Sequence, residues 1–313
     1  MLKAGRKVAI VGVGAVGASV AYALSVTGVV TELVLVDLSR DRAEGEAMDL
    51  SHAAAFIKPV EIYAGDYTDC RDAAIVVFTA GANQKPGETR LDLLKKNYAI
   101  LKDTLPRLMP LQEGAILLMV ANPVDVLTYA ALKITGLPPR CAFGSGTALD
   151  SSRFRHSLSS YLGIASRSIH AYVVGEHGDS EVLLWSHAYV AGTGIDDYCR
   201  LAGLPPLDRM AVDRSVRNAG YEIIARKGVT NYAISLAVKQ ICEGILRDED
   251  AIMTVSGLIE GSYGIGGCCL SLPCVISDGG KGRPLELLLA PEEEEALLHS
   301  AAVMKNAIAS LGI

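Results

Sequence analysis

The first half of the chain alternates short apolar runs with longer segments of helical pattern, and this alternation limits the fold more than any other feature. Four runs rich in branched residues have the length of buried strands. They lie at residues 8–11, 33–36, 75–78 and 116–120. Helices are expected between and after them, at residues 15–25, 42–54, 91–108 and 124–134. The alternation predicts an α/β fold with a Rossmann-type doubly wound parallel sheet.

The pattern changes after Gly146, where helices and strands follow one another irregularly. Helices are expected at residues 149–162, 208–225, 232–246 and from the acidic run 292–295 to about 311. Strands are expected at residues 169–174, 251–259 and 270–275. We therefore predict two domains, residues 1–145 with the parallel sheet and residues 146–313 with a mixed α+β fold that carries the substrate site.

Composition excludes several classes of protein. The chain has 313 residues, half of them hydrophobic, and a net charge of −6, which offers no positive field to attract nucleic acid. It contains no apolar stretch long enough for a membrane span. Its seven cysteines are scattered and form no C-x-x-C pair, unlike a disulfide framework or a structural zinc site. We expect a cytoplasmic protein with reduced thiols and without a metal.

A glycine-rich segment directly follows the first predicted strand and begins the first predicted helix. Gly12, Gly14 and Gly17 fit a tight turn that brings backbone N–H groups close to a pyrophosphate. Asp37 ends the next strand, where a carboxylate binds ribose hydroxyls and repels a 2′-phosphate. Flavin and S-adenosylmethionine sites share this glycine pattern, and Arg40 would tolerate a phosphate, but the full arrangement favours NAD. The predicted cofactor residues here are Gly12, Gly14, Val16, Gly17 and Asp37.

Two further motifs carry groups suited to carbonyl reduction, which needs a proton donor and a cation for a carboxylate. His177 follows a predicted strand between small residues and is the best acid/base candidate of the six histidines. Asp150 and Arg153 lie three residues apart on one predicted helix and face the same side of it. The alternative for this pair is an ordinary ion pair on the surface of that helix.

Together these motifs resemble the lactate/malate dehydrogenase family, and the resemblance extends over nearly the whole chain. Two more segments contribute to it, residues 80–90, which look like the family's mobile active-site loop, and residues 120–125 after a core strand. The resemblance implies that His177 donates and accepts the proton, that Asp150 is its partner, and that Arg153 binds the substrate carboxylate.

The resemblance also assigns residues that surround the reacting carbonyl. Arg90 would polarise the carbonyl when the loop closes, so it counts with the catalytic and the substrate-binding residues. Asn122 would hydrogen-bond near the nicotinamide and the reacting oxygen, and Thr230 would form a wall of the pocket.

Gln84 occupies the position that contacts the substrate's far end, where malate dehydrogenases carry an arginine. A neutral amide suits a substrate with one carboxylate, that is, a small 2-oxo or 2-hydroxy monocarboxylate. We therefore expect reversible reduction of pyruvate to L-lactate by NADH. This reaction belongs to fermentative glycolysis. The alternatives are another L-2-hydroxy-acid dehydrogenase, of malate or hydroxyisocaproate type, and a non-catalytic NAD-binding structural protein.

Regulation and assembly are expectations from the resemblance alone. Arg155 and His170 occupy positions that bind fructose 1,6-bisphosphate in allosterically activated bacterial members. A homotetramer is expected from the family, and the sequence does not distinguish it from a dimer.

Overall fold

The computed structural model describes residues 6–82, 87 and 89–313, and a nine-stranded sheet forms its centre. The strands of this sheet are β1 (Lys7–Val11), β2 (Glu32–Val36), β3 (Glu61–Ala64), β4 (Ile75–Phe78), β5 (Ile116–Met119), β6 (Ala142–Gly144), β12 (Ala251–Glu260), β13 (Gly266–Ser277) and β14 (Gly280–Pro284). Their order is β14-β13-β12-β6-β5-β4-β1-β2-β3, with β1 to β6 parallel and β12 to β14 antiparallel. The winding direction reverses between β1 and β4, and ligands bind such sheets beyond the carboxyl ends of those strands.

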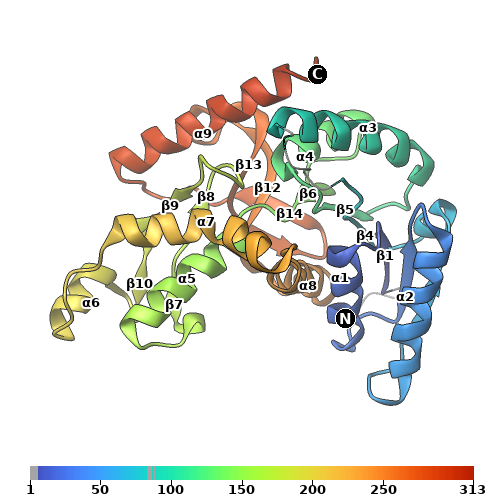
Figure 1. Ribbon diagram of the computed structural model, residues 1–313. Helices are drawn as coiled ribbons and strands as arrows, with labels where there is room; N and C mark the ends of the chain where they lie inside the picture. The colour runs from blue at the N-terminus through green and yellow to red at the C-terminus, as the bar shows by residue number, and fades with distance from the viewer. Residues whose placement is uncertain (1–5, 83–86, 88) are drawn as a thin grey trace.

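Helices cover both faces of the sheet. One face carries α1 (Ala15–Ser25), α2 (Arg40–His52) and α8 (Tyr232–Arg247), and the other carries α3 (Arg90–Leu108), α4 (Val124–Thr135) and α9 (Pro291–Ala309). Figure 1 shows α3, α4 and α9 above the sheet and α1 and α8 below it. Residues of β1 alternate between the faces, since Val8 and Ile10 pack with α1 and α8, whereas Ala9 and Val11 pack with α3 and α4. This confirms the doubly wound α/β fold.

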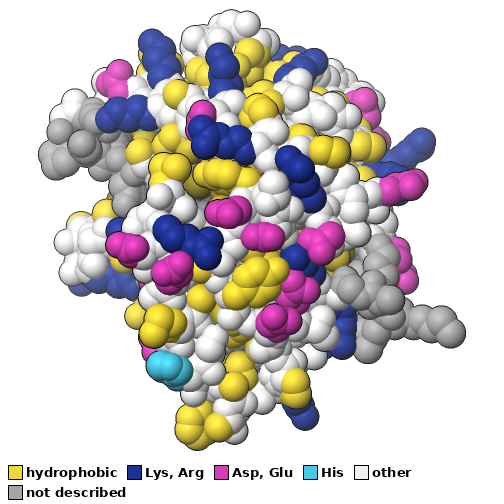
Figure 2. Space-filling model, turned by 90° about the vertical axis from the view of Figure 1, so that its right-hand side faces the viewer, with side chains coloured by type: hydrophobic (Ala, Val, Ile, Leu, Met, Phe, Trp, Pro, Cys, Tyr) yellow, Lys and Arg dark blue, Asp and Glu magenta, His cyan; other side chains and the backbone are white. Residues whose placement is uncertain are grey.

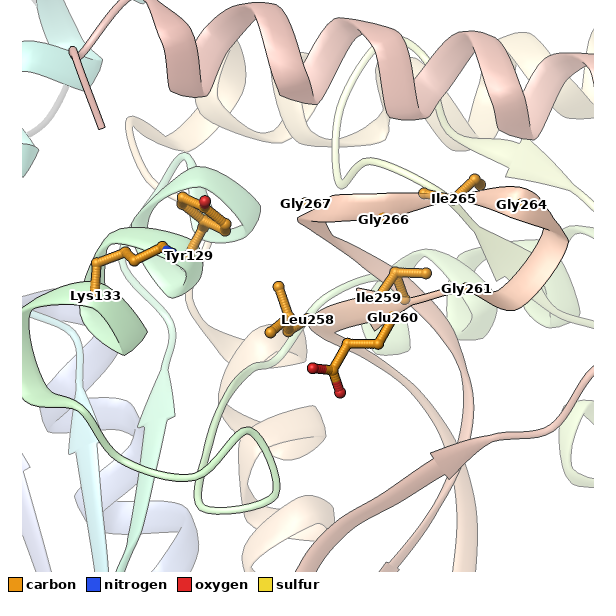
Figure 3. A pocket seen from close by; sticks show the side chains of 10 residues that line it. All are labelled: Tyr129, Lys133, Leu258, Ile259, Glu260, Gly261, Gly264, Ile265, Gly266 and Gly267. Carbon is orange, nitrogen blue, oxygen red and sulfur yellow. The ribbon is translucent and has the colours of Figure 1, made fainter.

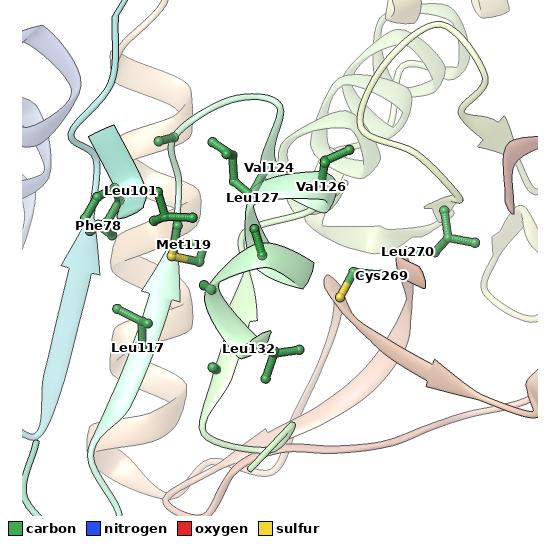
Figure 4. Packing of buried hydrophobic residues seen from close by; sticks show 14 of the residues in the cluster. Phe78, Leu101, Leu117, Met119, Val124, Val126, Leu127, Leu132, Cys269 and Leu270 are labelled. Carbon is green, nitrogen blue, oxygen red and sulfur yellow. The ribbon is translucent and has the colours of Figure 1, made fainter. Parts of the chain in front are cut away.

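The core on the α3 and α4 face holds the ends of two central strands in place (Figure 4). Phe78, Leu117 and Met119 from β4 and β5 are fully buried there, and they share one cluster with Leu101 of α3 and Leu127 of α4. Close-packed side chains of this kind resist displacement. The segments that follow β4 and β5 therefore start from fixed points.

A smaller unit of the second half stands beside this sheet. It contains α5 (Ala148–Leu162), α6 (Ile195–Leu201), α7 (Arg209–Lys227), the strand pair β8 (Val173–Val174) and β9 (Val182–Leu183), and a three-stranded sheet of β7 (Ile169–His170), β10 (Tyr189–Val190) and β11 (Thr193–Gly194). Its core includes Phe154 and Leu158 of α5 and Val216 of α7. Figure 1 shows α6, β7 and β10 at the far end of the molecule from α2.

The structure corrects one predicted strand. Residues 169–174 do not form a continuous strand, because β7 pairs with β10 and β8 pairs with β9 in a different sheet. Between them, the backbone carbonyls of Ala171 and Tyr172 accept hydrogen bonds from Arg155 and Leu184. Branched residues predict an extended backbone, but they do not reveal that two halves of a run pair with different partners.

The remaining predicted helices and strands are present with small shifts of their ends. The sequence interpretation missed several short elements, among them β3, β6 and β14. It also missed that β12 pairs with β6, with Ser256 opposite Gly144, so strands of the second half extend the first sheet. The predicted division at residue 145 falls between β6 and α5, and it stays a proposal.

Figure 2 shows one face of the molecule, on the side where α2 lies in Figure 1, with acidic, basic and hydrophobic side chains interspersed. Neither sign of charge gathers there into a continuous field of the kind that attracts nucleic acid. Within the described part of the chain, none of the helices has the length and hydropathy needed to cross a membrane.

Candidate active site

Glycine is required at one position in the turn between β1 and α1 and at one position in the first turn of α1. Gly12 has φ +93°, and a Cβ there would lie 2.6 Å from backbone atoms of Ala80. A Cβ on Gly17 would lie 1.9 Å from the carbonyl oxygen of Gly12. Gly14 differs, because a Cβ there would meet nothing within 4 Å, and it leaves an open approach to the backbone. Close packing behind the turn and open space in front of it suit a bound pyrophosphate.

The predicted acidic residue and the helix end complete this site. One oxygen of Asp37 accepts the N–H of Val13 at 2.8 Å, so it lies beside the glycine turn. The first hydrogen bond within α1 runs from Ala18 to Gly14, so the amides before it, including that of Val16, belong to the free end of the helix. Arg40, which would tolerate a phosphate, is bound to Glu44 at 2.7 Å. These residues fit NAD.

His177 lies on the loop of residues 175–181 that joins β8 to β9, called the catalytic loop below. Its backbone N–H donates to Asp125 at 2.8 Å, and the other oxygen of Asp125 accepts the hydroxyl of Ser256 at 2.6 Å. Burial raises the pKa of Asp125 to about 6. Residues from α4 and β12 thus hold the catalytic loop by its backbone.

The histidine, the aspartate and the arginine predicted from two separate motifs form one chain of contacts. Nδ1 of His177 lies 2.6 Å from Oδ2 of Asp150, and Arg153 donates to the other oxygen of Asp150 at 2.8 Å. Asp150 is 1% exposed, so the alternative of a surface ion pair is wrong. With Nδ1 held by the carboxylate, Nε2 is the nitrogen left to act on a substrate.

Charge and burial oppose each other in this chain of contacts. Burial acts to raise the pKa of Asp150, but the charges of His177 and Arg153 and their hydrogen bonds lower it overall. Burial acts to lower the pKa of His177, but the charge of Asp150 and its hydrogen bond raise that pKa to about 9. The imidazole therefore carries a proton at neutral pH and can donate it.

Arg90, the third predicted catalytic residue, binds Asp179 and Tyr221 rather than His177 or Asp150. It begins α3, and its guanidinium forms two contacts of 2.8 Å with the carboxylate of Asp179 and a third with the hydroxyl of Tyr221. Both members of the Arg90–Asp179 pair are more than half exposed. Exposed ion pairs contribute little to stability, so Arg90 can exchange Asp179 for a substrate at small cost.

Asn122 follows β5 with its side chain exposed at the carboxyl end of the sheet. The buried Asn97 donates to its carbonyl at 2.6 Å and accepts the N–H of Ala82 at 2.7 Å, which ties together the segments after β4 and β5. Thr230 is half-buried in the connection between α7 and α8. Gln84 lies outside the described residues.

One predicted effector residue, Arg155, contacts the residues that directly follow the other, His170. Arg155 donates to the carbonyl of Ala171, the neighbour of His170, at 2.9 Å, and its guanidinium lies 5.4 Å from the ring centre of Tyr172. Burial lowers the pKa of Arg155. His170 is exposed on β7.

One pocket adjoins the catalytic loop. That pocket, of about 390 Å³, is lined by Arg90, Asp179, Glu181, Arg217 and His299, among others. A second pocket, of about 430 Å³, lies between α4 and the turn that joins β12 to β13 (Figure 3). Its lining is mainly apolar and glycine-rich, with Lys133 and Glu260 as the charged residues. The pocket of about 390 Å³ is thus next to the catalytic loop, and Arg90 is the predicted catalytic residue that lines it.

Three residues of this region were missed from the sequence. Asp125 lies inside the segment 120–125, yet nothing local shows that its carboxylate holds a loop 52 positions away. Asn97 looks like an ordinary helix residue, and Glu181 looks like the solvated end of an acidic motif. Both are buried. An unexpected polar residue on the apolar side of α3 was the only available signal for Asn97.

Comparisons with known proteins agree with this geometry. The family model for the NAD binding domain of lactate/malate dehydrogenases matches residues 6–144, and the model for the alpha/beta C-terminal domain matches residues 147–311. The L-lactate dehydrogenase of Moorella thermoacetica is 50% identical, over 100% of this chain and 99% of the relative. That of Clostridium perfringens strain SM101 is 46% identical over 97% of each chain.

Solved structures give the same result. A lactate dehydrogenase from a Medee basin deep-sea metagenome library superposes with a TM-score of 0.94 at 42% identity, over 100% of both chains. A minor L-lactate dehydrogenase from Enterococcus mundtii has the same TM-score at 40% identity, over 98% of this chain and 99% of its own. This chain therefore belongs to the lactate/malate dehydrogenase family and uses NAD.

Proposed function

We propose that this protein is an L-lactate dehydrogenase, which reversibly transfers a hydride between NADH and pyruvate. The contact chain of His177, Asp150 and Arg153 carries the proposal, because it joins a protonated imidazole to a cation for one carboxylate. Relatives of about half identity over the full chain are L-lactate dehydrogenases, which supports it. A non-catalytic NAD-binding protein would have no need of a buried Asp150 beside His177.

Each residue of the chain of contacts has a part in the reaction. Arg153 binds the pyruvate carboxylate through two parallel hydrogen bonds and so orients the carbonyl. The nicotinamide supplies the hydride, which forms the new C–H bond of lactate. His177 donates the proton of Nε2 to the carbonyl oxygen as its negative charge develops. Asp150 stabilises the imidazolium before this transfer and keeps the ring oriented after it.

Three further residues act on the carbonyl and the pocket. Arg90 leaves Asp179 and Tyr221 and donates to the carbonyl oxygen, which favours charge development there. Asn122 hydrogen-bonds near the nicotinamide and the reacting oxygen, and Thr230 forms a wall of the pocket. The open carboxyl end of the sheet beside Asn122 supports its part.

Substrate profiling tests the proposal directly. The absorbance of NADH at saturating cofactor would be followed with pyruvate, oxaloacetate and 2-oxoisocaproate as substrates. We expect kcat/KM to be highest for pyruvate. No turnover of any 2-oxo acid would support a non-catalytic protein, and a preference for oxaloacetate or 2-oxoisocaproate would assign another dehydrogenase of the family.

Replacing Gln84 with arginine should shift the preference from pyruvate toward oxaloacetate. A second carboxylate would gain a partner, whereas pyruvate would leave the new guanidinium without one, at a cost of about 3–5 kcal/mol where water is excluded. Each 1.4 kcal/mol is about tenfold, so the ratio of kcat/KM values should change roughly hundredfold or more. Gln112→Arg is the control, because Gln112 is exposed and precedes the amino end of β5. A ratio within a few-fold of the parent would remove Gln84 from the substrate site.

Fructose 1,6-bisphosphate should lower the pyruvate concentration needed for half-maximal rate. Arg155 binds the carbonyl of Ala171, which directly follows the exposed His170 of the edge strand β7. Cations facing their symmetry mates can hold phosphates between subunits. The measurement is the pyruvate saturation curve at several pH values, with Arg155→Gln as the variant expected to lose the response. An unchanged curve in the parent protein would exclude this regulation.

The assembly is proposed to be a homotetramer in the cytoplasm, with a cofactor domain of residues 1–145 and a substrate domain of residues 146–313. Large apolar side chains exposed on helices support subunit contacts. They include Tyr22 of α1, Met48 of α2, and Tyr232 and Leu236 of α8, each more than half exposed. Exposed apolar side chains of this kind can be buried between subunits. Light scattering of the purified protein measures the subunit number.

A further inference from the structure

Glu181 is a buried acidic residue of the catalytic loop for which the reaction described above has no use. It is 3% exposed and directly precedes β9. Its backbone is held on both sides, since its N–H donates to Gly178 at 3.2 Å and its carbonyl accepts from Arg217 at 2.8 Å. Among the described residues, its Oε1 is the one buried side-chain oxygen or nitrogen without a hydrogen-bond partner.

The other buried carboxylates of this region are arranged differently. Asp125 has one oxygen on the backbone of His177 and the other on Ser256, and Asp150 has one on the ring of His177 and the other on Arg153. A carboxyl group that serves only to hold the fold is satisfied in this way. Oε1 of Glu181 has no such partner, so we expect Glu181 to affect its neighbours mainly through its charge.

Charged groups act on Glu181 from every side of the pocket beside the catalytic loop. Those that influence its charge are Asp150 and Arg153 of α5, His177 of the same loop and Arg217 of α7. Others line the same pocket, namely Arg90 of α3, Glu176 and Asp179 of the loop, and His299 of α9. Burial, followed by the charge of Asp150, raises the pKa of Glu181 to about 8, against the lowering effect of the cations.

We propose that Glu181 is a positioning residue of the dehydrogenase site, whose negative charge keeps the proton on His177 and so extends pyruvate reduction to alkaline pH. This inference rests on the proposed function. Glu181 is neutral below about pH 7, where His177 needs no help to stay protonated. Above pH 8 Glu181 is ionised, and its charge contributes to the raised pKa of His177.

The test compares Glu181→Gln with the parent over pH 6 to 10 in both reaction directions. Pyruvate reduction needs protonated His177, so its kcat/KM should fall at a lower pH in Glu181→Gln than in the parent. Asp150 acts on His177 more strongly than Glu181 does, so we expect a shift of about half a pH unit, which at pH 9 is a loss of about twofold. Lactate oxidation needs neutral His177, so its rise should move to lower pH by the same amount. Below pH 7 the variant should match the parent.

Two matched variants separate charge from structure. Glu181→Asp keeps the charge and should keep the alkaline limit near that of the parent. Glu222→Gln removes an exposed charge from α7 and should change nothing. An equal loss of activity at all pH values would show a merely structural role for Glu181 and overturn the inference, as would profiles that superimpose.

A measurement on the parent protein does not depend on activity, and the variant His177→Asn serves in it only to assign a signal. In protein labelled with ¹³C-histidine, the ring signal of His177 is identified by its absence from His177→Asn. We expect it to titrate in two steps, the first as Glu181 ionises near pH 8. A single step would overturn the inference. Inactive parent enzyme with a two-step titration would instead refute only the proposed reaction.

Discussion

Replacing His177 with asparagine should lower kcat for pyruvate reduction by roughly 10²–10⁴-fold, the usual contribution of a positioned general acid. Asparagine keeps the backbone N–H that Asp125 accepts, so the catalytic loop should remain in place. It has no proton to give to the carbonyl oxygen at neutral pH. The measurement is single-turnover oxidation of NADH with pyruvate in excess.

Binding of NADH should change little in this variant, because the glycine turn follows β1 and Asp37 follows β2, in the other half of the chain. Fluorescence of bound NADH measures this binding. His52→Asn, an exposed change at the end of α2, is the matched control and should leave both quantities unchanged. Turnover near that of the parent in His177→Asn would show that another group supplies the proton.

Replacing Asp150 with asparagine should lower kcat/KM for pyruvate by roughly 10³–10⁴-fold, the loss that follows when a catalytic histidine loses its carboxylate partner. The amide can donate to Nδ1 and favour the wrong tautomer of His177. It also leaves Arg153 without its anionic partner at 2.8 Å. Both the proton donor and the carboxylate site are therefore damaged by one substitution.

The pH dependence of Asp150→Asn distinguishes this explanation from a general loss of structure. In the parent, the pKa of His177 is about 9, so we expect pyruvate reduction to be lost as pH rises through that value. Without Asp150, burial lowers the pKa of His177, so the remaining activity should disappear at a lower pH than in the parent. Asp103→Asn removes an exposed partner of Arg107 and is the control. An alkaline limit that stays near pH 9 would contradict the role of Asp150.

Much of the fold could be predicted from residues that are close together in the sequence. The helix at residues 15–25 and the strand at residues 75–78 have the predicted ends, and the glycine turn between β1 and α1 has the predicted conformation. Such features depend on residues a few positions apart, whose periodicity and turn chemistry are written in the sequence. The assignments of His177, Asp150 and Arg153 needed the family resemblance, because each motif alone allows an ordinary structural part.

Contacts between residues far apart in the sequence could not be predicted from local pattern. The run at residues 169–174 looks uniform, yet its two ends pair with strands that come later in the chain. Arg90 meets Asp179 across 89 positions, and Ser256 meets Asp125 across 131. No periodicity marks such partners.

The protonation of the site depends on the same kind of contact. Against the effect of burial, the charge and the hydrogen bond of Asp150 raise the pKa of His177, whereas burial is the main cause of the raised pKa of Glu181. Local side-chain pattern determines which segments become helices, strands and turns, since each is stabilised by residues close in sequence. The charge that a buried group carries depends on the dielectric surroundings and the ionised neighbours that packing places around it, and these exist only in the folded chain.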